Sequence, residues 1–216
     1  MTTKLIIARH GNTFEPDETP RRVGARTDLE LVEKGIVQAT QLGTWLQMQD
    51  LNPQRIIAGP LKRTRRMAEI ARGVMYHDDS EKPNVEIDER LREIDYGPDE
   101  DLREEEVVNR IGADAIAKWD QDAIVPEGWN VDPDELQKHW QDIANDITQN
   151  NENEIVLVVT SNGVARFAPY LTGNFAGFKS KFSLKLATGA VGILNFDGKD
   201  WQVEDWNIRP HKELEE

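Results

Sequence analysis

Apolar residues along this chain fall into two recurring patterns, short continuous runs and segments with helical spacing. The continuous runs predict buried strands at 5–8, 55–58, 84–87, 154–160, 190–196 and 201–206. Helical spacing predicts helices at 33–48, 61–72, 102–119 and 132–147, and a further helix that starts at 164 and extends to 171. Because helices separate most of the strands, the pattern predicts an α/β fold with a mostly parallel central sheet. Asp197-Gly198 between the last two runs predicts an antiparallel hairpin.

Length and composition set the size of the domain. The chain has 216 residues, of which 38% are hydrophobic, and this is enough for one sizeable core. We therefore expect a single domain over residues 1–216, with a helical cap or insert at about 98–150. Within that insert, Asp132 is placed to cap the helix that follows it. The chain contains no cysteine, which excludes disulfides, a thiolate nucleophile and cysteine-based metal sites.

The formal net charge of −14 argues against a protein that binds nucleic acid or an anionic membrane, because both partners require clustered Lys and Arg. A small anionic substrate remains compatible with this charge where cations are concentrated locally. The N-terminal residues lead directly into the first apolar run, and no apolar stretch approaches the length of a membrane-spanning helix. We therefore expect a cytoplasmic protein without a signal peptide, present as a monomer or a homodimer.

Candidate chemistry follows the first apolar run, where Arg9, His10 and Gly11 stand in sequence. In open α/β sheets, ligands bind just beyond the carboxyl ends of the strands. Arginine offers a planar fork of donors that suits phosphate, and a neutral imidazole can act as a nucleophile. Glycine permits a sharp turn and the close approach of a ligand to the backbone. Taken alone, however, such a tripeptide more often marks a strand that ends in a surface Arg and His.

Two further predicted strands end in polar residues beside Gly or Pro. These segments are Gly59-Pro60-Leu61-Lys62-Arg63 and Ser161-Asn162-Gly163. With Arg9-His10-Gly11 they make the sequence resemble the histidine phosphatase superfamily, which includes the cofactor-dependent phosphoglycerate mutases. Other segments similar to the family's motifs are Asp28, Leu31, Gly35, Gln38 and Ala39, then Leu91-x-Glu93-x-x-Tyr96-Gly97, and finally Trp206-Asn207-x-x-Pro210. The resemblance spans nearly the whole chain and implies a three-layer α/β/α fold.

The resemblance also implies a phosphomonoester hydrolase that works through a phosphohistidine. In such a mechanism, neutral His10 attacks phosphorus while Arg9 and Arg63 bind the non-bridging oxygens, where the transition-state charge lies. The same two cations lower the pKa of His10 and thereby keep it neutral. The substrate is then a phosphorylated small molecule, and neither a metal nor a cofactor is required.

Glu93 is implied as the proton donor to the leaving oxygen and as the base that activates water in the second step. This role requires a raised pKa, which burial or a nearby phosphate charge can supply. From the residues alone, the alternative is a surface carboxylate paired with Arg90 or Arg92.

The sequence departs from the family pattern at Asn162, where the family has a second histidine. Asparagine can donate a hydrogen bond to a phosphoryl oxygen but carries no positive charge. By analogy with oxyanion-hole deletions, such a loss slows the chemistry by a factor on the order of 10²–10³. Gly163 offers a backbone N–H at a helix start. The family's later phosphate-binding asparagine is also missing, so that Asn12 is the nearest amide.

Several functions remain open from the sequence. The leading hypothesis is a phosphatase impaired by Asn162. A second is a weak or inactive relative that binds phosphorylated ligands or a protein partner. A phosphoglycerate mutase is disfavoured, because the insert is short and acidic, and an unrelated α/β domain is disfavoured by the order of the motifs. Among the six tryptophans, Trp129 is expected to lie at the substrate entrance, since its loop contains Pro and Gly.

Overall fold

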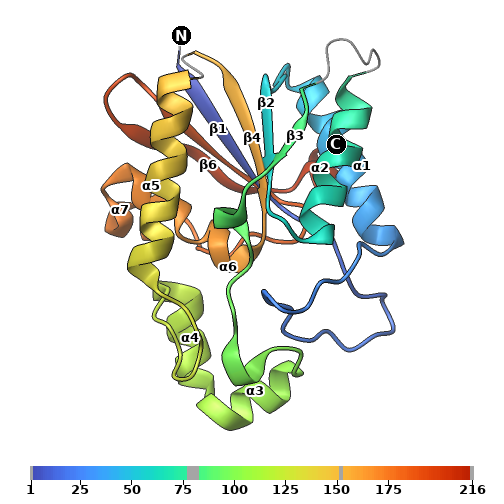
Figure 1. Ribbon diagram of the computed structural model, residues 1–216, viewed down its shortest axis with the longest axis vertical. Helices are drawn as coiled ribbons and strands as arrows, with labels where there is room; N and C mark the ends of the chain where they lie inside the picture. The colour runs from blue at the N-terminus through green and yellow to red at the C-terminus, as the bar shows by residue number, and fades with distance from the viewer. Residues whose placement is uncertain (1, 77–82, 151–152, 215–216) are drawn as a thin grey trace.

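The fold is built around a six-stranded sheet with the strand order β3-β2-β4-β1-β5-β6 (Figure 1). The computed structural model describes residues 2–76, 83–150 and 153–214. The strands are β1 (Thr3–Arg9), β2 (Arg55–Ala58), β3 (Val85–Ile87), β4 (Ile155–Thr160), β5 (Val191–Phe196) and β6 (Trp201–Ile208). The first four run parallel, whereas β5 pairs antiparallel with both β1 and β6. The predicted α/β fold, with a mostly parallel sheet, is therefore confirmed.

β1 lies between β4 and β5 near the middle of the sheet. Leu5 and Ile7 belong to the hydrophobic core on one face, and Ile6 and Ala8 belong to the core on the other. All four side chains are fully buried, as the continuous apolar run predicts for a strand covered on both faces. Burial of each larger side chain stabilises the fold by roughly 1.5–3 kcal/mol. The carboxyl end of β1 is therefore held firmly by the core beneath it.

Helices cover both faces of this sheet and complete the three layers (Figure 1). On one face lie α1 (Glu33–Met48) and α2 (Lys62–Met75), with α8 (Pro210–Glu213) against α1. On the other face lie α5 (Pro133–Asn150), α6 (Asn162–Ala165) and α7 (Phe175–Lys179). The remaining helices, α3 (Glu104–Ile111) and α4 (Ala113–Asp122), lie beyond the carboxyl ends of the strands. Three short 3-10 turns occur at η1 (Glu89–Leu91), η2 (Gly97–Asp99) and η3 (Ala168–Thr172).

The structure corrects two helix predictions. The single helix predicted at 102–119 is divided into α3 and α4 at Gly112, whose φ of 84° is incompatible with a continuous right-handed helix. The helix predicted from 164 to 171 is instead the short α6 followed by η3, and Pro169 in η3 lacks the N–H that a continuing α-helix needs. By contrast, Asp132 caps α5 as predicted, because its side chain accepts hydrogen bonds from the N–H groups of Asp134 and Glu135.

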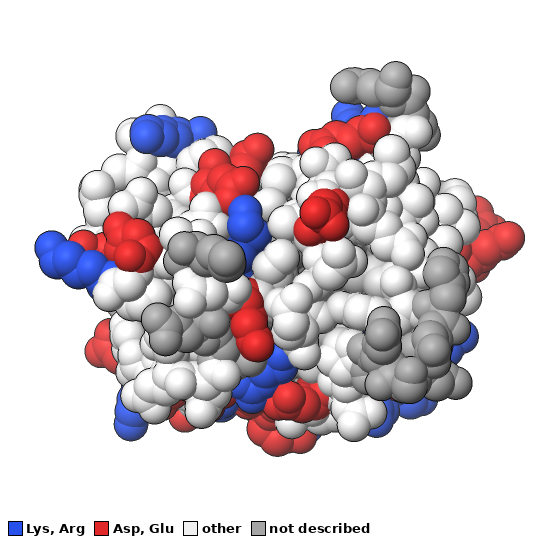
Figure 2. Space-filling model, turned by 90° about the horizontal axis from the view of Figure 1, so that it is seen from above, with Lys and Arg blue, Asp and Glu red and all other residues white. Residues whose placement is uncertain are grey.

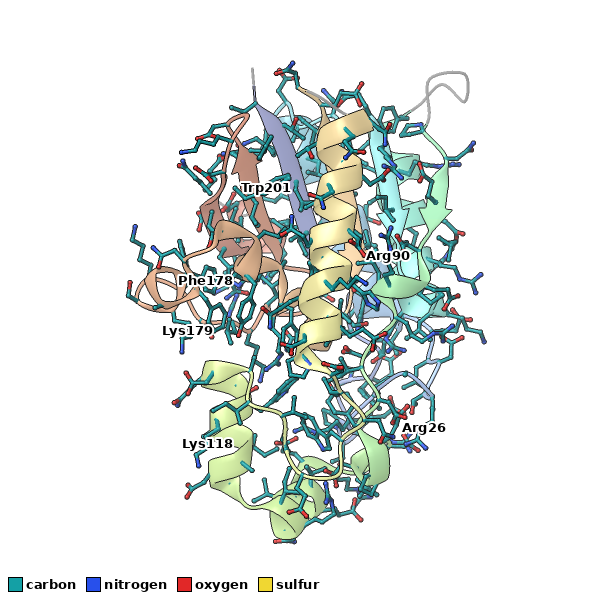
Figure 3. The ribbon with its side chains drawn as sticks, turned by 60° about the vertical axis from the view of Figure 1, so that its left-hand side comes forward. Arg26, Arg90, Lys118, Phe178, Lys179 and Trp201 are labelled. Atoms are coloured by element: carbon teal, nitrogen blue, oxygen red, sulfur yellow. The ribbon has the colours of Figure 1, made fainter. Side chains whose placement is uncertain are left out.

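The loop that follows β1 and the α3–α4 segment meet beyond the sheet and are tied together. The N–H of Arg22 donates to the Leu102 carbonyl at 2.8 Å, and the N–H of Asp101 donates to the Arg22 carbonyl at 2.9 Å. The Arg22 side chain also pairs with Glu104. On the opposite side, Lys179 of α7 pairs with Asp122 at the end of α4, and Figure 3 shows Lys179 beside that helix. These contacts fix α3 and α4 over the carboxyl edge of the sheet.

The opposite edge of the sheet has a different surface. Figure 2 shows acidic and basic side chains interspersed on that face, without a broad patch of one sign. Within residues 2–76, 83–150 and 153–214, no helix has the length and apolar character that a membrane span requires.

Candidate active site

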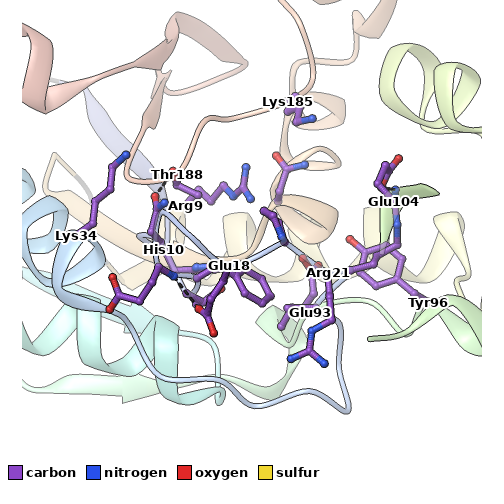
Figure 4. Close-up of a pocket in the computed structure, with 18 of the residues that line it drawn as sticks. Arg9, His10, Glu18, Arg21, Lys34, Glu93, Tyr96, Glu104, Lys185 and Thr188 are labelled. Atoms are coloured by element: carbon purple, nitrogen blue, oxygen red, sulfur yellow. Dashed lines mark hydrogen bonds and ion pairs between the residues drawn. The ribbon is translucent and has the colours of Figure 1, made fainter. Parts of the chain in front are cut away.

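The candidate site lies where β1 and β4 end side by side. The two strands pair in register up to Arg9 opposite Thr160, and the N–H of His10 donates to the Thr160 carbonyl at 3.0 Å. This pairing brings His10 and Asn162 to the wall of one cavity of about 680 Å³, a size typical of small-molecule sites. Figure 4 shows Arg9, His10 and Glu93 around this cavity. Residues from three predicted motifs therefore meet in one place.

His10 is buried and held in one orientation. Its Nδ1 lies 2.8 Å from the Gly11 carbonyl oxygen, and because a carbonyl can only accept, Nδ1 must carry the hydrogen. The other ring nitrogen, Nε2, is then left with its lone pair. Burial, and after it the positive charges of Arg63 and Arg9, hold the pKa of His10 well below its usual value of 6.5. His10 is therefore a neutral imidazole at pH 7, with an unprotonated Nε2.

Gly11 serves a different purpose from the one that the sequence suggests. It makes no left-handed turn, since it is absent from the glycines with positive φ. A Cβ at this position would lie 2.7 Å from the Gly35 carbonyl oxygen, and a Cβ on Gly35 would lie 2.2 Å from the Asn12 carbonyl oxygen. The backbone after β1 therefore packs directly on the start of α1. The Asn12 N–H also donates a hydrogen bond to Gln38 Oε1 of α1, at 2.8 Å.

The two candidate phosphate-binding arginines occupy different positions. Arg9 lines the cavity, and its Nη1 donates to the Leu186 carbonyl at 2.6 Å. Arg63 is fully buried and is absent from the described residues that line the cavity. Its terminal nitrogens donate to the carbonyls of Thr27 at 2.7 Å and Gly24 at 3.2 Å. Arg63 thus anchors the loop after β1, and its charge lowers the pKa of His10 from behind the cavity wall.

Glu93 lies inside the site and makes no surface ion pair. It is only 5% exposed and lines the cavity, whereas Arg90 pairs with Asp88 and Arg92 pairs with Glu89. The surface-carboxylate alternative is therefore wrong. Burial raises the pKa of Glu93, although the charge of Arg63 and two backbone hydrogen bonds oppose that rise. Among the titratable groups at the site, a carboxyl with a raised pKa and an imidazole with a lowered pKa are suited to acid and nucleophile roles respectively.

Gly163 supports Glu93 directly. Its N–H donates to Glu93 Oε2 at 3.2 Å, while the N–H of Ile94 donates to Glu93 Oε1 at 3.0 Å. A Cβ on Gly163 would lie 2.4 Å from Glu93 Oε1. The N–H that the sequence suggests for phosphate is thus engaged by Glu93, and Gly163 does not appear among the described lining residues. A residue without a side chain is needed here to leave room for the carboxyl group.

Asn162 and Asn12 both line the cavity, and each uses its side-chain oxygen within the protein. Asn162 Oδ1 accepts from the Leu186 N–H at 3.0 Å, and Asn12 Oδ1 accepts from the Thr188 hydroxyl at 2.7 Å. With both oxygens engaged, the amide nitrogens are the groups left for a ligand. Neither Nδ2 has an acceptor among the described residues. Each asparagine therefore presents a neutral donor to the cavity.

The sequence did not identify Arg166 or Trp119 as residues of the site, yet both are buried and line the cavity with Tyr96. Arg166 Nη1 donates to the Trp119 carbonyl at 2.6 Å, and its guanidinium carbon lies 3.9 Å from the Trp119 ring centroid. Trp129 is not at the entrance. It is buried and donates from Nε1 to Asp99 at 2.7 Å. Arg166 stands alone in the segment after Asn162, with no motif around it, so the sequence did not distinguish it from a surface arginine.

The described residues contain no group of three or more His, Asp or Glu side chains that could hold a metal ion. Donors that line the cavity include Arg9, Asn12 and Asn162, and the carboxyls that line it include Glu15, Glu18 and Glu93. The three donors match an anion with several acceptor oxygens.

Comparison with known proteins agrees with this geometry. Residues 5–209 match the family model described as "Histidine phosphatase superfamily (branch 1)". The chain is 28% identical to the uncharacterized phosphatase PhoE of Bacillus subtilis (strain 168), with 97% of this chain and 96% of PhoE covered. It is 26% identical to the probable phosphoglycerate mutase GpmB of Erwinia tasmaniensis, with 95% and 90% covered.

A solved structure supports the same fold. The mycobacterial glucosyl-3-phosphoglycerate phosphatase superposes with a TM-score of 0.76 at 20% identity, covering 95% of this chain and 98% of that one. The family match over 5–209, with the partly buried Arg9 and the buried His10 at the end of β1, identifies the chain as a member of the histidine phosphatase superfamily.

Proposed function

We propose that this protein is a phosphomonoester hydrolase that forms a phosphohistidine at His10. The observation that carries the proposal is the state of His10, which is buried, neutral and bonded through Nδ1, so that Nε2 is free to attack. Phosphatases among its relatives, such as PhoE, support this reaction class. The phosphoglycerate mutase GpmB is also related, but the acidic segment from Asp95 to Glu106 makes a mutase the weaker candidate.

In the first step, His10 Nε2 attacks phosphorus and the bond from phosphorus to the ester oxygen breaks. Arg9, Asn12 and Asn162 supply donors for the non-bridging oxygens, and the buried charge of Arg63 stabilises the same region. Glu93, which starts protonated, transfers its proton to the leaving oxygen and releases the alcohol. The raised pKa of Glu93 supports this role.

In the second step, the Glu93 carboxylate removes a proton from a water molecule whose oxygen attacks phosphorus. The bond from phosphorus to Nε2 breaks, inorganic phosphate leaves, and His10 returns to the neutral form with its hydrogen on Nδ1. Glu93 is then protonated again for the next cycle. The N–H groups of Gly163 and Ile94 hold the carboxyl in one position through both steps.

We further propose that Asn162 slows this reaction. Asn162 presents a neutral amide where the family pattern has a histidine, so the transition state lacks one positive charge. The expected loss in rate is on the order of 10²–10³. The nucleophile, Arg9 and Glu93 are present, which favours a slow enzyme over an inactive protein.

The test is turnover of p-nitrophenyl phosphate and of a panel of metabolite phosphates by the wild-type protein and by His10→Ala. We expect slow hydrolysis by the wild type and a fall of about 10⁴-fold or more for His10→Ala, since removing a covalent nucleophile removes the pathway. Acid-labile radioactive phosphate on the wild-type chain, and none on His10→Ala, would identify the intermediate.

A second candidate function is the binding of phosphorylated ligands without efficient turnover, and Asn162 is the observation that favours it. Calorimetry with the same panel separates the two functions. Tight binding together with no turnover, both by the wild type and by Asn162→His, would overturn the phosphatase proposal and support the binding protein.

A further inference from the structure

The segment that leads into β5 is bonded to all three donors proposed for the phosphoryl oxygens. The Leu186 carbonyl accepts from Arg9 Nη1 at 2.6 Å, and the Leu186 N–H donates to Asn162 Oδ1 at 3.0 Å. Because an N–H can only donate, this bond fixes the orientation of Asn162 by itself. Two residues later, the Thr188 hydroxyl donates to Asn12 Oδ1 at 2.7 Å. The segment therefore determines which atoms of the two asparagines are left for a ligand.

The orientation of Asn12 requires a further partner. The oxygen and the nitrogen of a carboxamide have nearly the same size, so packing alone does not decide which of them faces a ligand. Thr188 lines the cavity on the same side as Arg9 and His10 (Figure 4), but a hydroxyl can both donate and accept. Its contact with Asn12 is therefore compatible with either orientation of the carboxamide, and the choice depends on what else the hydroxyl is bonded to.

Gln38 makes that choice. It is buried and packs against Gly189, where a Cβ would lie 3.1 Å from Gln38 Cβ. The backbone N–H of Asn12 can only donate, and it is bonded to Gln38 Oε1 at 2.8 Å. Gln38 Nε2 is thereby turned toward Thr188, where it donates to the carbonyl at 3.1 Å and to the hydroxyl at 3.4 Å. Since the Thr188 hydroxyl accepts from Gln38, its single hydrogen is left for Asn12 Oδ1.

These hydrogen bonds close a ring that begins and ends at Asn12. We call it the Asn12 ring, and its members are Asn12, Gln38 and Thr188. In the reversed orientation, Asn12 Nδ2 would face the Thr188 hydroxyl, whose hydrogen has no other acceptor among the described residues. Asn12 Oδ1 would then point into the cavity, where it repels the oxygens of an anion. Both changes are unfavourable, so the ring keeps the Asn12 N–H groups turned toward the ligand.

We propose that Gln38 and Thr188 are positioning residues, which hold the Asn12 carboxamide with its nitrogen toward the phosphoryl group at His10. The inference rests on the proposed function. Both residues act through Asn12, whose Nδ2 donates to a non-bridging oxygen. Because the donor is already oriented before the substrate arrives, no reorganisation is needed as negative charge develops on that oxygen.

The test measures kcat/KM for p-nitrophenyl phosphate and, by calorimetry, the affinity for inorganic phosphate. Thr188→Val removes the hydroxyl but keeps the shape of the side chain, so Asn12 is free to turn, and we expect both quantities to fall about 3- to 10-fold. Thr188→Ser keeps the hydroxyl and should restore both to within about two-fold of the wild type. Gln38→Met removes every side-chain hydrogen bond of Gln38 and should cost about 10-fold or more. Thr40→Val is the matched control, because Thr40 is exposed on α1 and its hydroxyl donates to the Ile36 carbonyl.

A double-mutant cycle separates positioning from an ordinary structural role. Asn12→Ala alone should lower kcat/KM about 10- to 100-fold, the usual loss when a donor to a charged oxygen is removed. In the Asn12→Ala background, Thr188→Val should add nothing, because no carboxamide is left to orient. If Thr188 instead only stabilised the segment before β5, its replacement would lower activity by the same factor in both backgrounds.

Each outcome decides the inference. Equal losses for Thr188→Val with and without Asn12 would overturn it while leaving the phosphatase intact, and so would unchanged turnover and phosphate affinity in Thr188→Val or in Asn12→Ala. If Gln38→Met does not fold, the Thr188 variants decide. If the wild type binds phosphate but turns over no phosphomonoester, the proposed function fails, and the same cycle measured on phosphate affinity decides the role of the Asn12 ring. If the wild type neither binds phosphate nor hydrolyses phosphomonoesters, both proposals are wrong.

Discussion

The ends of β1 and β4 lie side by side, yet they supply the site with different chemistry. The end of β1 delivers Arg9 and His10, a cation and an imidazole whose pKa is strongly lowered. The end of β4 delivers Asn162 and Gly163, a neutral amide and a backbone N–H that holds Glu93. In the proposed mechanism, one strand end carries the group that attacks phosphorus, and the other positions the group that transfers protons. Nucleophilic attack and proton transfer are then assigned to different strand ends of one sheet.

Among changes at the β4 end, the largest expected effect comes from removing the proton donor that this end holds in place. For Glu93→Gln we expect alkyl phosphates to lose about 10²- to 10⁴-fold in kcat, because no group then protonates the leaving oxygen. p-Nitrophenyl phosphate needs little protonation, so its first step should survive. Stopped-flow measurement should then show a burst of p-nitrophenol followed by slow turnover. Equal losses for both kinds of substrate, without a burst, would contradict the role of Glu93 as general acid.

A gain of activity is expected when the β4 end, like the β1 end, carries a histidine. Asn162→His restores a cationic donor beside His10 and should raise kcat about 10²- to 10³-fold if the rest of the site is competent. Steady-state kinetics with p-nitrophenyl phosphate measure this change. Asn162→Gln, which lengthens the side chain but adds no charge, is the matched control. A decrease for Asn162→His would show that Asn162 is adapted to its present role.

A smaller effect is expected from crowding the carboxyl group. Gly163→Ala places a methyl group where a Cβ would lie 2.4 Å from Glu93 Oε1, so the carboxyl must move. We expect kcat to fall about 10-fold or more, together with a loss of roughly 1–3 kcal/mol in the free energy of unfolding. Kinetics and urea unfolding measure the two effects. Gly173→Ala is a useful contrast because nothing lies within 4 Å of its Cβ, although its positive φ of 64° adds some strain.

The smallest effect concerns the pH dependence of stability at the β1 end. The pKa of His10 is lowered in the folded state, so below pH 6.5 the unfolded chain binds a proton that the folded chain does not. Stability should therefore fall as the pH drops below 6.5, by about 1.4 kcal/mol per pH unit from this group. Urea unfolding of the wild type and of His10→Ala between pH 7 and 5 isolates the contribution. Parallel curves for the two proteins would contradict the lowered pKa.

Much of the fold could be predicted because β1 and β4 are short continuous apolar runs, a pattern typical of strands covered on both faces. Arg9 and His10 could also be predicted from the sequence as site residues, because they stand at the end of such a run. The break at Gly112 was not, since the residues on both sides keep helical spacing and only the backbone angle reveals the division. Boundaries of this kind depend on tertiary packing, which local patterns do not record.

The grouping of Arg22, Tyr96, Trp119 and Arg166 along the cavity lay beyond the reach of the sequence for a related reason. These residues come from the loop after β1, from the segment between η1 and η2, from α4 and from the position after α6, and ion pairs of Arg22 and Lys179 fasten the α3–α4 segment to the rest of the molecule. Trp129 illustrates the opposite error, since a loop that contains Pro and Gly predicted a side chain at the substrate entrance, whereas its indole is buried against Tyr96 and Trp119.

The hydrogen bond between His10 Nδ1 and the Gly11 carbonyl also predicts which isomer the proposed phosphohistidine takes. With Nδ1 engaged, phosphorylation is confined to Nε2, which gives the 3-phospho isomer and excludes the 1-phospho isomer. An isomer-specific antibody applied to the trapped protein would therefore report on this single hydrogen bond. Nitrogen-15 labelling of His10 would show a protonated Nδ1 both before and after phosphoryl transfer. The Gly11 carbonyl thus selects Nε2 as the reactive nitrogen by keeping Nδ1 protonated.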